Sequence, residues 1–226
     1  MLSYATLNKK PKELLALTGL ARREFEALLP AFARALPVPR ARKKRQRAVG
    51  GGRKPALASP ADQLLFILVY LKTYPIQAVQ AELFGMSQSS ANRYLHRLLP
   101  VLAAALDELG VLPERDGARL ARAAGAGADL IVDGTERRRQ RPKKAPMRAV
   151  HYSGRKKTHA DKNLVVVERS SGQVRYLSPT RPGSVHDKTA AEYERLRYPP
   201  DCILRSDLGF YGYAPRVGRH RQVKKA

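Results

Sequence analysis

Positive charge is the sequence feature that most restricts how this chain can fold. Its 226 residues contain 43 Lys and Arg against 19 Asp and Glu, which gives a formal net charge of +24. Such a surplus opposes compaction by self-repulsion unless a polyanion is the natural partner. Nucleic acid fits that requirement, because neutralised phosphates release counterions and drive binding. A membrane partner is not indicated, since the sequence has no run of 18 apolar residues and no basic amphipathic helix with aromatic anchors.

The charge is distributed unevenly along the chain and predicts separate parts. Residues 1–60 contain 14 basic and 3 acidic side chains, residues 61–125 contain 6 of each, and residues 126–226 contain 23 and 10. A neutral block therefore lies between two basic blocks. With the patterns described below, it predicts an N-terminal helical segment (1–39), a basic linker (40–58), a helix-turn-helix domain (59–117) and an α/β domain (128–226).

The first block predicts helical pieces over residues 11–36, followed by a basic segment. Pro37 ends the second helix, in which five apolar side chains share one face: Phe25, Leu28, Leu29, Phe32 and Leu36. From Arg40 to Lys54, 8 of the residues are basic, so nothing there can build a core. The segment is either a solvated linker or an arm that contacts phosphates. In the second case the contacts come from Arg42, Lys43, Lys44 and Arg45.

A buried helix is predicted to follow the basic segment. Ser59 can cap it, Pro60 suits its first turn, and Asp62 favours the helix dipole. The apolar run from Leu64 to Leu71 predicts burial on nearly all sides.

Residues 76–99 have the spacing of a helix-turn-helix. Ile76 to Phe84 and Ser87 to Leu99 each predict a helix, and Gly85 between them suits a tight turn that needs positive φ. The first turns of the second helix present side chains suited to base edges and phosphates, namely Gln88, Ser89, Ser90, Asn92 and Arg93. An ordinary helical hairpin has the same pattern, and the neutral charge of this block is a mild objection to DNA binding.

The last block predicts short strands with one helix. The strands are expected near 130–133, 164–167, 174–177 and 202–207, the helix near 187–197, and a flexible join over 118–128. This order is typical of an α/β or α+β fold. Asp133 and Asp207 each end a predicted strand, and groups at strand ends meet in one crevice. Two carboxylates there suit Mg²⁺ or Mn²⁺, although the two residues by themselves favour a pair of unrelated strand-end acids.

Several motifs in a fixed order give the chain a family resemblance. The sequence contains Leu83-Phe84-Gly85-Met86-Ser87, Asp133-Gly134-Thr135-Glu136, Gly154-Arg155-Lys156-Lys157, Ser184-Val185-His186-Asp187 and Asp207-Leu208-Gly209-Phe210. This set resembles the DDE-superfamily endonucleases of bacterial insertion-sequence transposases, in the group numbered five. The resemblance covers the chain up to about residue 214.

The resemblance implies a fold class and a function. It implies an all-α helix-turn-helix region followed by an RNase H-like mixed sheet, with Asp133 and Asp207 as the first two metal-binding acids. The family cuts DNA at transposon ends and joins the freed 3′-hydroxyl to target DNA. Two further groups are expected near the DNA: His186 and Asp187, which shape the site unless Asp187 only caps a helix, and Arg155, Lys156 and Lys157, which meet phosphate unless they form a solvated strand edge.

The third acid of the family is where this sequence departs from the resemblance. The sequence given ends 19 residues after Asp207, that stretch contains no acid, and Glu192 and Glu194 precede Asp207 in the wrong element. We therefore expect an incomplete catalytic domain that cuts poorly alone. The alternative is a catalytically inactive, DNA-binding repressor of transposition. The resemblance also leads us to expect double-stranded DNA as partner, homo-oligomers on paired ends, and a bacterial cytoplasmic, nucleoid-associated location.

Overall fold

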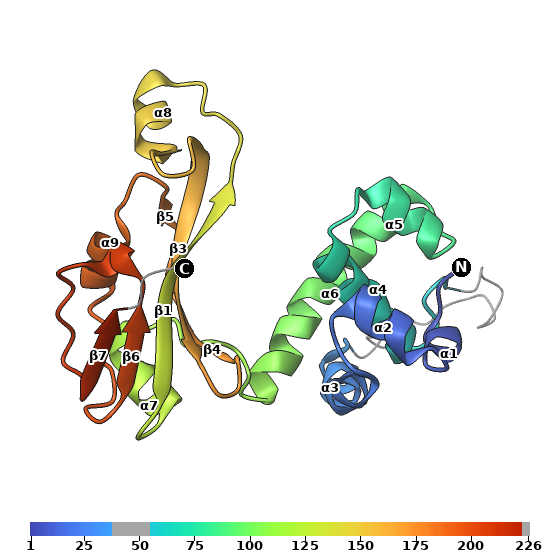
Figure 1. Ribbon diagram of the computed structural model, residues 1–226. Coiled ribbons are helices and arrows are strands. Elements are labelled where there is room, and N and C mark those ends of the chain that lie inside the picture. The colour runs from blue at the N-terminus through green and yellow to red at the C-terminus, as the bar shows by residue number, and fades with distance from the viewer. Residues whose placement is uncertain (38–54, 223–226) are drawn as a thin grey trace, which may run out of the picture. The chain divides into compact units, whose positions relative to one another are not determined.

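The computed structural model describes residues 1–37 and 55–222, which form two units, Met1–Val111 and Leu112–Ala226. The predicted phosphate contacts Arg42, Lys43, Lys44 and Arg45 lie outside the described residues. Figure 1 shows that the first unit is helical and that the second is built on a sheet. No helix of the described residues is long and apolar enough to cross a membrane.

The helices of the first unit pack around one central helix. They are α1 (Tyr4–Leu7), α2 (Pro11–Thr18), α3 (Arg22–Ala35), α4 (Pro60–Thr73), α5 (Gln77–Leu83) and α6 (Gln88–Glu108). Ser59 caps α4 as predicted, because its Oγ accepts the backbone N–H of Asp62 at 3.0 Å. Residues 64–69 are buried and contact α2, α3 and α6. The predicted burial ends there, since Leu71 is 48% exposed.

Helices α2 and α3 confirm the two helical pieces predicted before the basic segment. Phe25, Leu28 and Phe32 are buried on the face of α3 that the sequence indicates, while Leu29 and Leu36 are partly buried against the same core. Helix α3 ends at Ala35, before Pro37. The helices before and after residues 38–54 therefore share a single hydrophobic core.

The turn between α5 and α6 has the predicted form. Gly85 has a φ of 62°, a region that glycine occupies at little cost. Ala81 and Ala91 are buried, so small side chains stand where the two helices approach. Helix α6 runs past the predicted end at Leu99 to Glu108. The helix continues through Pro100, although proline removes one backbone hydrogen bond. The apolar face of α6 after Pro100 is buried and α6 packs against α3, and this packing stabilises the helix by more than the lost hydrogen bond costs.

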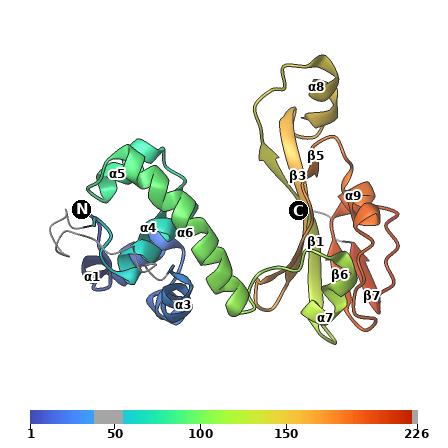
Figure 2. The ribbon, with the colours of Figure 1, turned by 180° about the vertical axis from the view of Figure 1, so that it is seen from behind.

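The second unit contains a mixed sheet in the order β2-β3-β1-β6-β7, with β4 and β5 also paired to β3. Its strands are β1 (Asp129–Arg138), β2 (Tyr152–Ser153), β3 (Thr158–Glu168), β4 (Val174–Leu177), β5 (Arg181–Pro182), β6 (Ile203–Ser206) and β7 (Arg219–Gln222). Strand β1 pairs antiparallel with β3 and parallel with β6. A helical region followed by a curled mixed sheet confirms the predicted α/β, RNase H-like fold class (Figures 1 and 2).

The helical elements of this unit are η1 (Gly117–Arg119), α7 (Leu120–Ala124), α8 (Ala145–His151), α9 (Asp187–Glu194) and η2 (Leu208–Phe210). The predicted flexible join over 118–128 is wrong. Those residues form η1 and α7, and Leu120, Ala124 and Ala128 are buried in the core of the sheet unit. Alanine is a strong helix former, and one buried leucine is enough to dock the short helix.

Two predicted boundaries shift in the structure. Strand β1 does not end at Asp133 but continues to Arg138, because β3 is long enough to pair with every residue up to that point. Asp133 therefore lies within a strand, opposite Val165. Helix α9 ends at Glu194 rather than near 197, where Arg195 adopts a left-handed φ of 47°.

Candidate functional site

Asp133 in β1 and Asp207 directly after β6 lie at the same level of two neighbouring strands. Strand β1 pairs in parallel with β6, with Ile131 opposite Arg205 and Val132 opposite Ser206. The next residue in the sequence is an aspartate in both segments, Asp133 after Val132 and Asp207 after Ser206. Asp133 Oδ1 accepts the backbone N–H of Gly134 at 2.8 Å. Sequence spacing suggested that both acids end a strand, whereas only Asp207 does so, and strand register brings them to the same level.

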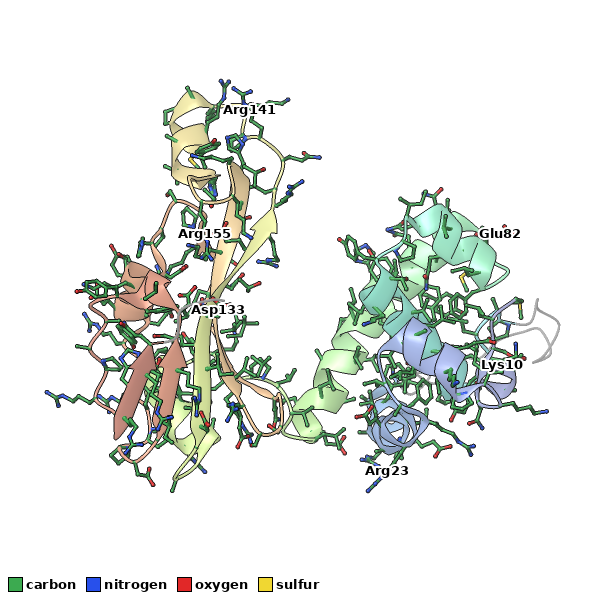
Figure 3. The ribbon with its side chains drawn as sticks, viewed as in Figure 1. Lys10, Arg23, Glu82, Asp133, Arg141 and Arg155 are labelled. Carbon is green, nitrogen blue, oxygen red and sulfur yellow. The ribbon has the colours of Figure 1, made fainter. Side chains whose placement is uncertain are left out.

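Arg155 connects Asp207 to a second acid. Asp207 Oδ1 accepts the backbone N–H of Gly209 at 2.9 Å, which fixes the carboxylate at the start of η2. Arg155 Nη2 lies 3.9 Å from Asp207 Oδ2, and its Nη1 lies 3.6 Å from Asp187 Oδ2. The structure therefore brings together three of the predicted site residues. Figure 3 labels Asp133 and Arg155 within the sheet unit.

A buried lysine holds Asp187 in place. Lys162 Nζ lies 2.8 Å from Asp187 Oδ1 and 3.4 Å from Glu136 Oε1, and it donates to the carbonyl oxygen of Val185 at 2.7 Å. The side chains of Lys162, Glu136 and Asp187 are only 6–7% exposed. Asp187 is the first residue of α9, and His186 occupies the N-cap position of that helix.

Sequence reasoning missed Lys162 and the role of Glu136. The two residues face each other across the antiparallel pair of β1 and β3. A lysine inside a strand was the available signal, but its partners depend on a register that the sequence does not reveal.

Two motif glycines allow Asp187 to approach both strands. A side chain at Gly134 would overlap the Asp187 carboxylate. A Cβ at Gly209 would lie 2.9 Å from Asp187 Oδ2 and 2.9 Å from Asp207 Oδ1. The glycines that follow the two aspartates are therefore required by close packing of three carboxylate-bearing segments.

These groups line a hollow of about 690 Å³. Its charged wall consists of Glu136, Arg155, Lys162, Asp187 and Asp207, and the segment 183–186 with His186 completes it. Asp133 is not part of this lining. The hollow therefore gives access to Asp207 from the side of α9, with both cations and acids at its surface.

The predicted DNA-reading residues lie at the start of α6. Gln88, Ser89 and Arg93 are exposed, while Ser90 and Asn92 are half-buried. Arg93 Nη2 donates to Ser90 Oγ at 3.1 Å, and together with Gln77 the exposed residues line a hollow of about 650 Å³. Asn92 Nδ2 donates to Gln77 Oε1 at 3.1 Å, so this side chain is already oriented by α5.

Comparison with protein families identifies both units. Residues 55–108 match the helix-turn-helix of DDE superfamily endonuclease, and residues 132–210 match the DDE superfamily endonuclease itself. The chain belongs to the DDE superfamily of endonucleases. The two matches together support a transposase-like, DNA-cutting function, and they imply that this endonuclease binds DNA. No curated protein and no solved structure matches the chain.

Endonucleases of this superfamily generally use divalent metal ions, and the donor chemistry of the two aspartates fits that use. Mg²⁺ takes hard oxygen ligands and is commonly held by one or two carboxylates with water and phosphate. Asp133 and Asp207 supply such oxygens from adjacent strand positions. Over residues 1–37 and 55–222, however, no group of three or more His, Cys, Asp or Glu side chains could hold a metal ion. The fit rests on the two aspartates.

The other acids of the endonuclease site already have cationic partners. Lys162 neutralises Glu136 and Asp187. Glu194 on α9 receives a hydrogen bond from the Tyr176 hydroxyl at 2.6 Å and pairs with the guanidinium of Arg181. Burial and this carboxylate raise the pKa of Tyr176. Glu194 therefore joins α9 to β4 and β5 through these two contacts.

Proposed function

We propose that this endonuclease cuts DNA at transposon ends and joins the freed 3′-hydroxyl to target DNA by metal-dependent phosphodiester transfer. The observation that carries the proposal is the register of β1 and β6, which sets Asp133 beside Asp207 within the region matched by the endonuclease family. The matched helix-turn-helix region supplies the DNA-binding element that such a reaction needs.

Each residue in the proposal has a defined task. Asp133 and Asp207 would hold the divalent ion, Mg²⁺ or Mn²⁺, which supplies Lewis acidity at the phosphodiester when bound. Arg155, which lies next to Asp207, contacts the phosphate to be cut. Lys156 and Lys157 continue from it along the same turn and hold neighbouring phosphates. His186 and Asp187 shape the hollow that receives the DNA strand.

The proposed chemistry needs no covalent protein intermediate. In the first step a water oxygen attacks phosphorus and the 3′-oxygen of the DNA leaves as a hydroxyl. In the second step that 3′-hydroxyl attacks a target phosphodiester, and the target's own 3′-oxygen leaves. The residues of the chain position the two strands and stabilise the charge that develops on the phosphate oxygens.

Base recognition is assigned to the start of α6. Gln88 and Asn92 suit adenine, Arg93 suits guanine or phosphate, and Ser89 and Ser90 suit either. We further propose double-stranded DNA as the substrate, assembly of several copies on paired ends, and action at the bacterial nucleoid.

A second candidate function is DNA binding without cutting, as in a repressor of transposition. It is favoured by one observation: across the described parts of the chain, no cluster of three ligating side chains is available for a metal. This candidate keeps the DNA contacts of α6 and of Arg155 to Lys157 but assigns no reaction to the two aspartates.

The metal response distinguishes the two functions. Purified chain is incubated with duplex DNA that flanks its own gene, in Mg²⁺ or in EDTA, and its melting temperature is measured under the same conditions. The proposed function predicts cutting in Mg²⁺ only, together with a rise in melting temperature that Asp133→Asn and Asp207→Asn remove. DNA binding with neither cutting nor a metal-induced shift would establish the repressor instead.

A further inference from the structure

The connection between β1 and β3 is the most basic part of the described chain. Residues 137–157 contain 10 Lys and Arg and no Asp or Glu. This connection, called here the basic arm, includes α8 and β2. In Figures 1 and 2, α8 stands at the end of the sheet where β1 and β3 extend beyond the other strands. The function proposed above uses only its last three cations.

The basic arm is fixed to the sheet at two points. His151, at the end of α8, is buried, and its Nδ1 lies 3.0 Å from Asp161 Oδ1 on β3. Arg139 Nη1 lies 2.9 Å from the same oxygen. Ser184 Oγ donates to the carbonyl oxygen of Val150 at 2.6 Å. These contacts hold the arm in one conformation, so binding a partner does not require ordering it first.

The loop that leads into α8 is held from within. Arg148 donates through Nε to the carbonyl oxygen of Pro142 at 3.1 Å and through Nη2 to that of Lys143 at 2.8 Å. One arginine of the arm therefore holds the backbone of the loop that carries Lys143.

The remaining cations of the arm face outward. They are exposed, and the ion pairs found among the described residues do not include them: Arg137, which donates to Asn163 Oδ1 at 2.8 Å, and Arg138, Arg141, Lys143, Lys144, Lys156 and Lys157. Like charges at this density repel one another and gain most from a polyanion. Exposed cations without carboxylate partners are suited to contacts with phosphates.

A shallow hollow opens on the basic arm. It measures about 550 Å³ and is lined by Arg141, Arg148, Ala149, Tyr152 and His159. The rings of Tyr152 and His159 meet edge to face with centroids 5.5 Å apart. Arg141 and Arg148 give this hollow a cationic lining that suits the phosphates of a nucleic acid.

We propose that the basic arm grips the phosphate backbone of duplex DNA beside the cutting site, independently of base sequence. The proposal rests on the function given above in that DNA is the partner. Near the C-terminal end of the arm, the guanidinium of Arg155 lies 3.9 Å from Asp207, so a duplex with its cut phosphate at Asp207 continues directly onto the arm. An acidic membrane is the competing polyanion, and this closeness to Asp207 favours DNA.

The test compares two variants with equal charge change. The arm variant is Arg141→Gln, Lys143→Gln, Lys144→Gln. The control is Arg115→Gln, Arg119→Gln, Arg122→Gln, whose exposed side chains lie around α7, at the opposite end of the sheet unit from α8 (Figure 1). Fluorescence anisotropy with a 40-base-pair duplex of arbitrary sequence is measured between 50 and 200 mM salt. Far-UV circular dichroism confirms that both variants fold.

Loss of three phosphate contacts has a defined signature. The slope of log affinity against log salt is expected to fall by about 3, and affinity near 0.1 M salt by on the order of a hundredfold. The control is expected to change affinity by less than about threefold, since it alters only the net charge. Equal slopes for the arm variant and the wild-type chain would overturn the proposal. So would wild-type binding to phosphatidylserine vesicles that is stronger than binding to the duplex and is lost in the arm variant.

The contact between the arm and DNA can also be tested on the wild-type chain, without any substitution. Acetylation of Lys143 and Lys144 is expected to slow at least fivefold when duplex DNA is added, while Lys10, at the N-cap of α2, serves as reference. Unchanged acetylation of both lysines would contradict the arm contact. Cutting assays in Mg²⁺, run beside the binding series, separate the two proposals: an arm effect together with a wild-type chain that does not cut leaves the arm standing and removes the proposed reaction. Cutting without an arm effect does the reverse.

Discussion

The two family-matched regions differ most in charge. Residues 55–108, the helix-turn-helix region, contain 3 Lys and Arg and 4 Asp and Glu, whereas residues 132–210, the endonuclease region, contain 18 and 9. Base contacts give sequence selectivity, while phosphate contacts supply salt-dependent affinity. Of these two regions, the nearly neutral one contains the residues proposed for base contacts, and the basic one contains the residues proposed for phosphate contacts.

The interiors of the two units also differ in charge. The helical unit buries apolar side chains with Thr18 and Gln80 as its buried polar residues, whereas the sheet unit buries the ionic group of Lys162, Glu136 and Asp187. Burying charges is costly unless they are paired. In the sheet unit these buried charges lie at the hollow beside Asp207. Such destabilising residues are expected where the needs of a functional site, and not stability, determine which residues are present.

The largest effect is expected from breaking the buried ionic group. Lys162→Met leaves Glu136 and Asp187 uncompensated and is expected to lower the free energy of unfolding of the sheet unit by about 3–5 kcal/mol. Urea denaturation gives the value, and hydrogen exchange by mass spectrometry assigns it to the unit.

Two matched variants sharpen this prediction. Lys188→Met removes a half-buried lysine whose Nζ lies 3.7 Å from Glu192, and it is expected to cost about 0.5 kcal/mol or less. In the helical unit, Gln80 donates to the carbonyl oxygen of Phe66 at 2.9 Å while its Oε1 is buried without a partner among the described residues. Gln80→Met is expected to be nearly neutral. A loss at Gln80 as large as at Lys162 would break the comparison of the two interiors.

A smaller effect is expected on sequence selectivity. Asn92→Ala and Arg93→Ala are each expected to reduce discrimination between preferred and other duplexes by about 1–3 kcal/mol. Selection of bound duplexes from a random library, followed by competition binding, measures this. The salt slope is expected to change by at most about 1, in contrast to the arm variant. Unaltered base preference in both variants would show that α6 does not read DNA.

The smallest effect concerns pH. Hydrogen bonds from Arg205, at 2.6 and 2.9 Å, lower the pKa of the Asp129 carboxyl. The stability that this pair contributes is therefore present above the ordinary aspartate pKa and is lost as pH falls through the lowered pKa of the folded state. Asp129→Asn is expected to lower the melting temperature of the sheet unit by a few degrees at pH 7 and to flatten its decline in acid. A decline as steep as that of the wild-type chain would contradict the assignment.

Local patterns in the sequence predicted local structure well. The turn at Gly85, the cap at Ser59 and the apolar face with Phe25 and Phe32 follow from spacing within a few residues, and the structure confirms each. The residues of α6 beyond Leu99 were missed because tertiary packing overrides the proline signal.

Long-range features of the site were less predictable. The family resemblance pointed to Asp133 and Asp207, and strand register sets them side by side. The partners of Lys162 depend on a pairing of β1 with β3 that no local pattern encodes. The extension of β1 beyond Asp133 has the same origin, since an antiparallel partner, not composition, determines where that strand ends.

The central claim is that Asp133 and Asp207 hold a divalent ion, and its most direct test is local cleavage by bound iron. Fe²⁺ replaces Mg²⁺, ascorbate and peroxide generate hydroxyl radicals at the ion, and mass spectrometry maps the cuts in the polypeptide. The account predicts cuts in β1 near Asp133 and after β6 near Asp207, suppressed by excess Mg²⁺ and absent in Asp133→Asn. Cuts at other places, or the same cuts in Asp133→Asn, would contradict it.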